Sequence, residues 1–440
     1  MTSAIIIPPV AWWVLPLVLA VPAAMLLLEH GLIRDYQARL FHRLFILAYV
    51  TFSGIGALYL TGDRALYLGY YAGYGLAYSL SFTVLWRQLE RRLPARFRPS
   101  DELPVLFKGW GWRTAMALYL LVMLVLLVYP ENKLMKVVVP PPLNILATWN
   151  EGLGIVPSRP EKYLSYLVLL LLPVYYYALG VARWRWPVKA ALVVLPAYLE
   201  YCRTGYLGRS EIMLVAAVVA IPFWLQRPAW RRWLLLATVV ALPFLLAAAY
   251  LFQCQRLGKS TDARLSWTDQ AVTILYQQTQ FPQNFPAVYR HGPRGRWGEV
   301  AAWLVTLPIP SVWCDKPSVR LNHELTAIVT GRVPGDQWYF VCLTGLVAES
   351  YYLLGPLFFL HAALLAVFSV FLLYLYSGGA KLHYVWAFIA FIMSYSVNRA
   401  GIAGCLPVMI NNLLVLNVLL VTGVVLSTVR GGAVAERPLG

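Results

Sequence analysis

Four arginines stand beside apolar stretches of the chain, where a positive charge can bind an anion: Arg203, Arg209, Arg256 and Arg399. The guanidinium group is planar and presents paired N–H donors, which suit the oxygens of phosphate groups. Ionisable side chains close to apolar segments are costly to place and are commonly functional. Any single arginine of this kind can instead snorkel to lipid phosphates or cap a helix C-terminus, and neither role requires a ligand.

Candidate acids and bases gather between residues 254 and 351. Glu349, in "GLVAESYYLLGPL", begins a long apolar stretch that would hold its carboxylate close to the membrane. A general base must lie within hydrogen-bonding reach of the proton that it removes. We therefore expect Glu349 as the first candidate base and His323 and Glu324 as the next. A helix-capping carboxylate and solvent-facing loop residues are the alternatives.

The sequence favours no metal ion, cofactor or nucleic acid as a ligand. Its six histidines are scattered, and the stretch 254–351 has no Asp-x-Asp pair. Glycine-rich nucleotide fingerprints and a nucleophile elbow are absent as well. The net charge of +17 is explained by basic loops at a cytoplasmic membrane face.

The elements that must position these residues are membrane-spanning helices, because 60% of the residues are hydrophobic and only 12% are charged. A helix needs about 20 apolar residues to cross a bilayer. About eleven windows approach that length: 5–28, 44–61, 65–86, 114–129, 164–181, 189–202, 210–226, 233–253, 352–376, 384–398 and 407–428. The expected fold class is an all-α polytopic membrane protein.

Short connections rich in arginine predict the orientation. The stretches 34–43, 87–113, 183–189 and 227–232 are basic, so the positive-inside rule places them in the cytoplasm. Counting windows from these anchors puts the four arginines and the segment 254–351 on the outer side. Four positive charges on the disfavoured side favour a shared anionic ligand. The expected organisation is N-terminal spans in 1–253, one large outer loop in 254–351 and C-terminal spans in 352–440, within a single membrane domain.

Three segments carry a resemblance to a known family. The stretch "LPIPSVWCDKP", which contains Trp313, Asp315 and Lys316, resembles the Pro-x-x-Trp-Pro-Asp-Lys-Pro signature of the Wzy-type polymerases of O-antigen and exopolysaccharide repeat units. "GRSEI" is similar to their Gly-Ser-Arg-Ser segment, and "VAESYYLLGPLF" to their Gly-Glu-x-Tyr-x-x-x-Gly segment. The chain departs at Cys314, where the family has proline, and lacks the first serine of the second segment.

The resemblance, which covers about residues 200–360, implies a GT-C-like bundle in the bacterial inner membrane, with its active site facing the periplasm. It implies polymerisation of undecaprenyl-pyrophosphate-linked oligosaccharides without a metal or cofactor. Arg209 would bind the pyrophosphate, with Arg203, Arg256 and Arg399 as supporting candidates from spacing. Trp313, Asp315 and Lys316 would shape the loop. Membrane lipids, a chain-length regulator and a flippase are candidate partners.

Two other functions stay open. An O-antigen ligase, which is related to these polymerases, would use the same donor with a lipid A core sugar as acceptor. A lipid-linked oligosaccharide flippase or another transporter would also be helical and rich in arginine, although transporters often contain paired repeats and none is found in this sequence.

Overall fold

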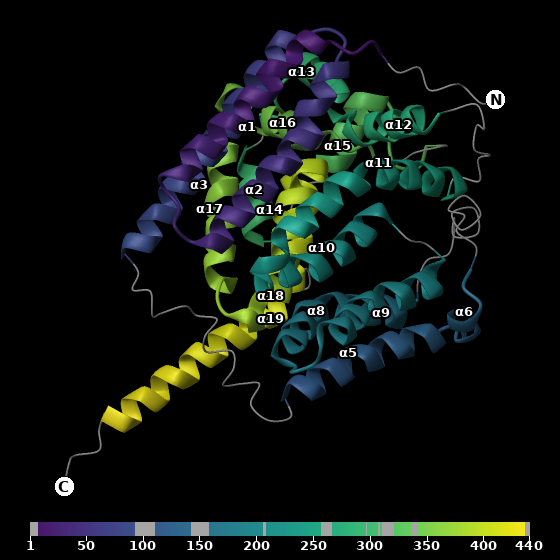
Figure 1. Cartoon of the computed structure of the whole chain (residues 1–440), viewed down its shortest axis with the longest axis vertical. Coiled ribbons are helices and arrows are strands. Elements are labelled where there is room, and N and C mark those ends of the chain that lie inside the picture. Colours follow the sequence, from purple (N-terminus) through teal and green to yellow (C-terminus); the bar gives the residue numbers. More distant parts are fainter. Residues whose placement is uncertain are drawn as a thin grey trace. The chain divides into compact units, whose positions relative to one another are not determined.

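The computed structural model describes residues 8–92, 111–141, 158–205, 208–256, 266–295, 297–306, 309, 321–336 and 341–435. Every regular element within these ranges is a helix, as Figure 1 shows. The all-α fold class is therefore confirmed.

Within the described ranges, nine helical segments are long and apolar enough to cross a membrane: Trp12–His30, Tyr36–Tyr59, Gly111–Val128, Arg159–Val181, Arg209–Gln226, Pro228–Gln255, Gly345–Tyr376, Ala380–Ile402 and Gly404–Gly423. Each overlaps one of the predicted windows. The two remaining windows fall on α3 (Arg64–Arg92) and α9 (Trp186–Thr204), which are helical but more polar. The multi-pass membrane class is confirmed, while the count of eleven spans stays a prediction.

The chain divides into two compact units that interleave in sequence. Unit 1 comprises Met1–Ala95, Val272–Tyr374 and Ile389–Ile410. Unit 2 comprises Arg96–Ala271, Leu375–Phe388 and Asn411–Gly440.

Unit 1 is organised around the buried face of α3. Tyr67, Tyr71, Tyr74, Tyr78 and Phe82 are all buried and recur every three or four residues, which is the spacing of one helix face. A buried hydroxyl needs a hydrogen-bond partner, and each of the four tyrosine hydroxyls has one. The partners are Ser53 O for Tyr67, Val18 O for Tyr71, His361 for Tyr74 and Ser369 Oγ for Tyr78. These bonds tie α3 to α1 (Leu15–His30), to the segment after α2 (Tyr36–Tyr49) and to α17 (Phe358–Tyr376).

Three irregular turns interrupt the helices of unit 1. The π-helix η2 (Val50–Gly54) follows α2, and the π-helix η9 (Ile392–Ser396) follows α18 (His383–Phe391). The ring of Phe52 in η2 and the ring of Tyr395 in η9 meet edge to face, with their centroids 5.1 Å apart. The third irregularity is Gly401 (φ +77°), which kinks α19 (Val397–Ala435). Such π-helical turns within α-helices are common at functional sites.

The predicted outer loop contains short helices in its described parts. They are α12 (Trp267–Thr279), η6 (Phe281–Asn284), α13 (Phe285–His291), α14 (Trp297–Thr306), α15 (Leu321–Thr330) and the beginning of α16 (Gly345–Leu354). The junction of α12 and η6 lies directly against Gly56, where an added Cβ would stand 1.9 Å from Thr279 O. Among these short helices, α13 contacts both α15 and α16, and α16 contacts the segment Val50–Gly54 that follows α2.

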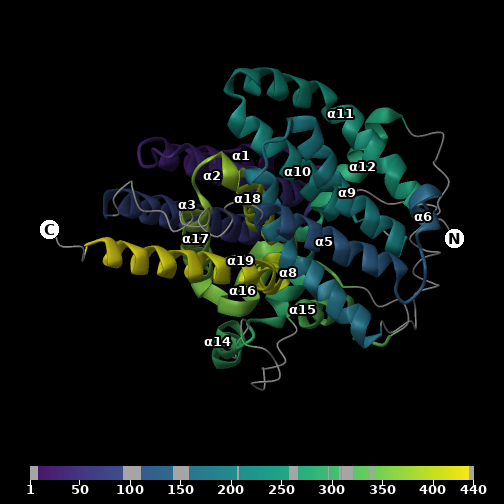
Figure 2. The same ribbon diagram turned by 90° about the horizontal axis from the view of Figure 1, so that it is seen from below.

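Aromatic contacts help to pack the helices of unit 2. It contains α5 (Gly111–Val128), α6 (Met135–Val138), α8 (Arg159–Val181), α9, α10 (Arg209–Gln226) and α11 (Arg231–Arg256). Figure 2 shows α5 running beside α8 and α9. The rings of Tyr119 and Tyr175 stack with their centroids 4.5 Å apart, which joins α5 to α8.

Candidate functional site

Glu349 is buried in the interior of unit 1. It is the fifth residue of α16, all ten residues of which are buried, and its own exposure is 1%. The helix is short because Gly345 (φ +76°) precedes its regular turns and Gly355 (φ +54°) ends them, and this backbone conformation favours glycine. Because Glu349 lies beyond the first turn, its carboxylate does not cap the helix.

The kink of α19 provides space for this carboxylate. An added Cβ on Gly401 would lie 1.3 Å from Glu349 Oε2, so only a glycine allows the carboxylate to take this position. Its positive φ also disfavours any other residue. Gly401 was not among the predicted site residues, although a glycine after "VNRA" at the end of an apolar window was a usable signal.

His361 lies beside Glu349, and Tyr74 contacts His361 in turn. His361 Nε2 lies 3.8 Å from Glu349 Oε1, and the two side chains are 7% and 1% exposed. On the other side of the ring, His361 Nδ1 lies 2.9 Å from the hydroxyl of Tyr74. These side chains come from α16, α17 and α3, so three separate segments of the chain build a carboxylate–imidazole–phenol series.

Arg399 is the predicted arginine that belongs to the same unit. It lies two residues before Gly401 and is half-buried. Its Nε atom has no hydrogen-bond partner among the described residues. Glu349 Oε2 lies against Gly401, so its carboxylate is close to the turn that carries Arg399. The structure therefore brings the first candidate base and one candidate anion ligand to the same kink.

Glu324 is held in an ion pair, which the sequence analysis did not anticipate. Arg294 Nε lies 2.8 Å from Glu324 Oε2, and Arg294 Nη2 donates to Oε1 at 3.1 Å. The hydroxyl of Tyr352 also donates to Oε2, at 3.0 Å. With these lone pairs occupied, Glu324 is better placed to anchor α15 than to accept a proton. His323 is half-buried beside it on α15.

The other three arginines belong to unit 2. Arg203, in the last turn of α9, forms a two-point contact with Glu200, with Nη2–Oε1 at 2.6 Å and Nε–Oε2 at 2.9 Å. Its Nη1 atom also lies 3.3 Å from Glu161 Oε1. Arg209 is the first residue of α10, a few residues after Arg203, and Arg256 is the last residue of α11. The predicted gathering of all four arginines on one diphosphate stays a prediction.

The loop motif residues Trp313, Asp315 and Lys316 lie outside the described residues. Within the part of the chain that the structure describes, no group of three or more His, Cys, Asp or Glu side chains could hold a metal ion.

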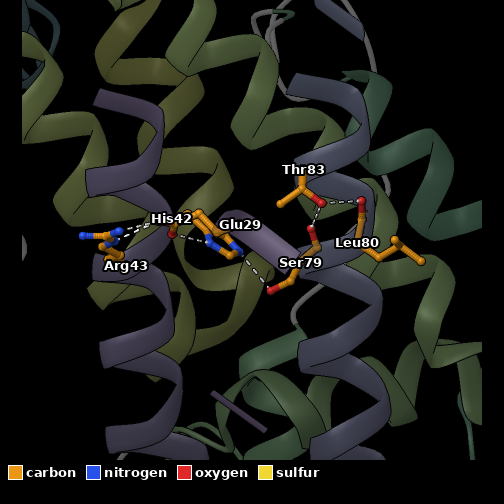
Figure 3. Close-up of polar contacts among 6 residues, drawn as sticks. All are labelled: Glu29, His42, Arg43, Ser79, Leu80 and Thr83. Carbon is orange, nitrogen blue, oxygen red and sulfur yellow. Dashed lines mark hydrogen bonds and ion pairs between the residues drawn. The ribbon is translucent and has the colours of Figure 1, made fainter. Parts of the chain in front are cut away.

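A second buried polar cluster lies in unit 1, which the sequence analysis missed. Figure 3 shows His42 of α2 between Glu29 of α1 and Ser79 of α3. His42 Nδ1 lies 3.1 Å from Glu29 Oε2, and His42 Nε2 lies 2.9 Å from Ser79 Oγ. Glu29 Oε1 accepts a hydrogen bond from Arg43 Nε at 2.8 Å. Glu29 and His42 are 1% and 0% exposed, whereas the side chain of Arg43 is 56% exposed.

Comparisons with protein-family models, with curated proteins and with solved structures found no match for this chain.

Proposed function

We propose that this protein is a membrane glycosyltransferase that polymerises undecaprenyl-pyrophosphate-linked oligosaccharide repeat units. The observation that carries the proposal is the buried carboxylate of Glu349, which lies at the Gly401 kink beside His361 and in the same region as Arg399. A glycosyl transfer from a diphosphate donor needs a base for the acceptor and cations for the leaving group. Both kinds of group occur here, and the resemblance of the three motifs adds support from sequence.

In the proposed reaction, Glu349 removes the proton from a hydroxyl of the acceptor sugar. The hydroxyl oxygen attacks the anomeric carbon of the growing glycan, and the bond from that carbon to the diphosphate oxygen breaks. The electron pair of that bond leaves with undecaprenyl pyrophosphate. A base of this kind contributes about 10²–10⁴ in rate. Acceptor binding must expose the carboxylate, which is covered in the free protein.

Arginines would stabilise the charge that develops on the leaving oxygen. One preorganised donor of this kind contributes about 3–4 kcal/mol to lowering the barrier. Arg399 and Arg209 are the principal candidates, with Arg256 in support. Arg203 is already neutralised by Glu200 and Glu161, so it would bind the diphosphate only by exchanging one of these partners. In this proposal the site faces the periplasm, and the protein resides in the bacterial inner membrane.

The test is to supply purified protein in detergent with labelled lipid-linked repeat units, with and without lipid A core as a second acceptor, and to separate the products by size. A ladder of lipid-linked repeats is the expected result. Transfer to a lipid A core sugar without a ladder would identify a ligase. No transfer by a folded preparation would contradict both enzyme functions.

A transporter is the second candidate, because unit 1 buries ionisable groups inside its helices. Glu29, His42, Glu349 and His361 are each at most 5% exposed, and such groups mark ion and substrate routes in membrane proteins. The detergent assay separates the two candidates, because a pure transporter has no membrane to act across and would yield no product. Movement of a labelled lipid-linked oligosaccharide across liposomes that contain the protein would support the transporter.

A further inference from the structure

We infer that His361 is a positioning residue for Glu349, and that Tyr74 fixes the hydrogen-bonding state of the His361 ring. This inference rests on the proposed function, in which Glu349 is the base. It assigns a role to two buried side chains that the proposed reaction does not otherwise use.

The contacts determine which ring nitrogen carries a hydrogen. Were Nδ1 of neutral His361 protonated, Nε2 would turn its lone pair toward the Glu349 carboxylate oxygen 3.8 Å away, which is repulsive. With the hydrogen on Nε2, an N–H dipole faces the carboxylate, and Nδ1 accepts the hydrogen bond from the Tyr74 hydroxyl at 2.9 Å. A protonated ring would also present Nε2–H to Glu349. In both states the group that faces the carboxylate is a donor.

This donor and Gly401 lie next to different oxygens of the Glu349 carboxylate. Oε1 faces His361, whereas Oε2 lies against Gly401, where no side chain intervenes. The facing donor and the space at Gly401 both favour this orientation of the carboxylate, and a displacement of about 1 Å in a catalytic group can cost about 100-fold in rate. Loss of the His361 donor should therefore lower kcat and leave acceptor binding nearly unchanged.

A neighbouring contact of the same chemistry offers a matched control. Tyr78 lies one helical turn beyond Tyr74 on α3, and its hydroxyl donates to Ser369 Oγ on α17 at 3.2 Å. Tyr74→Phe and Tyr78→Phe each remove one hydroxyl group that forms a hydrogen bond between α3 and α17. Only Tyr74 contacts the histidine that faces Glu349.

The experiment measures kcat and KM of sugar transfer in detergent for Glu349→Gln, His361→Leu, His361→Gln, Tyr74→Phe and Tyr78→Phe, using preparations that elute as the wild type does in gel filtration. We expect kcat to fall about 100-fold in His361→Leu with KM within about threefold, and to recover to within about tenfold of wild type in His361→Gln, whose amide restores a donor. Tyr74→Phe should lower kcat about tenfold, whereas Tyr78→Phe should change it less than twofold.

Two outcomes overturn the inference in distinguishable ways. If Glu349→Gln is inactive while His361→Leu and Tyr74→Phe retain wild-type kcat, His361 does not position the base, and the proposed function stands. If Glu349→Gln retains wild-type kcat, Glu349 is not the base, and both the catalytic assignment and this inference fall. Should His361→Leu not fold, the comparison of Tyr74→Phe with Tyr78→Phe gives the same decision.

Discussion

Glu349 Oε2 occupies the space beside Gly401 that the side chain of any other residue would fill, 1.3 Å from where a Cβ would stand. Gly401 also adopts φ +77° with ψ 176°, a backbone conformation that is essentially confined to glycine. The kink and the carboxylate therefore depend on each other, although 52 positions of sequence separate them.

Substitution of Gly401 by alanine should displace the Glu349 carboxylate. We expect Gly401→Ala to lower the transfer rate about 100-fold or more, because the new methyl group and Oε2 cannot share one position. The measurement is chain extension in detergent, normalised to folded protein. The control is Gly69→Ala, on α3, where an added Cβ meets nothing within 4 Å. Equal activity of Gly401→Ala and Gly69→Ala would contradict the importance of the kink.

Removal of the charge on Glu349 should stop the reaction without unfolding the protein. Glu349→Gln keeps the shape of the side chain but cannot accept a proton from the acceptor hydroxyl, so the rate should fall about 10²–10⁴-fold. The control is Glu299→Gln, since the side chain of Glu299 is 46% exposed and pairs with Arg294 away from the kink. A ladder of wild-type length from Glu349→Gln would assign the base to another residue.

The arginine hypothesis predicts sensitivity to the shape of the cation as well as to its charge. Arg399→Ala and Arg209→Lys should each abolish detectable chain extension while membrane insertion is retained. Lysine keeps the charge but loses the paired donors that fit a diphosphate, and each lost donor costs about 3–4 kcal/mol of barrier. Arg232→Lys, at an exposed position of α11, should extend chains normally. Wild-type chain lengths in both test variants would refute the hypothesis.

The helical membrane class could be predicted because a long apolar window is visible in the local sequence, without knowledge of which helices pack together. Nine windows overlap helical segments apolar enough to span a membrane. The sequence also placed Glu349 and Arg399 near the ends of such windows, and the structure brings both to the kink at Gly401. Long apolar runs in the local sequence contain enough information for these conclusions.

The partners of the charged groups were not predictable from spacing. His361 pairs with Tyr74, 287 positions away, and Arg203 pairs with Glu161, 42 positions away. The sequence predicted Glu324 as a candidate base or a solvent-facing loop residue, but Arg294 and Tyr352 contact its oxygens. Such contacts depend on how helices pack in three dimensions. The usable sequence signal for His361 and His42 was an ionisable residue within or at the edge of an apolar window.

The Cys342 thiol provides a test of pH dependence outside the membrane-spanning segments. Burial raises the pKa of this thiol, and the hydrogen bond from Asn284 opposes part of the rise. Because the thiolate is the reactive form, a raised pKa lowers its fraction at any pH below that value. In a chain whose other cysteines are replaced, Cys342 should react with iodoacetamide more slowly at pH 8 than an ordinary cysteine.

The comparison for this prediction is a cysteine at Val333, a position that is 51% exposed. The rate for Val333→Cys should level off at a lower pH than the rate for Cys342, whose thiol continues to ionise as the pH rises. Coincident rate profiles for the two cysteines would contradict the half-buried environment assigned to Cys342.

The Glu29–His42 cluster predicts an unusual order of stability among its variants. His42→Leu leaves the Glu29 carboxylate buried at 1% exposure with only Arg43 as its charged partner, and it removes the partner of Ser79. Breaking a buried pair in this way costs about 3–5 kcal/mol of folding free energy. Replacing Glu29 and His42 together by leucine leaves no buried charge, and Arg43, already 56% exposed, can turn to solvent. The double variant should therefore unfold at a higher temperature than His42→Leu, as measured by tryptophan fluorescence in detergent. A double variant less stable than the single one would show that the cluster stabilises the protein by more than the pairing of its charges.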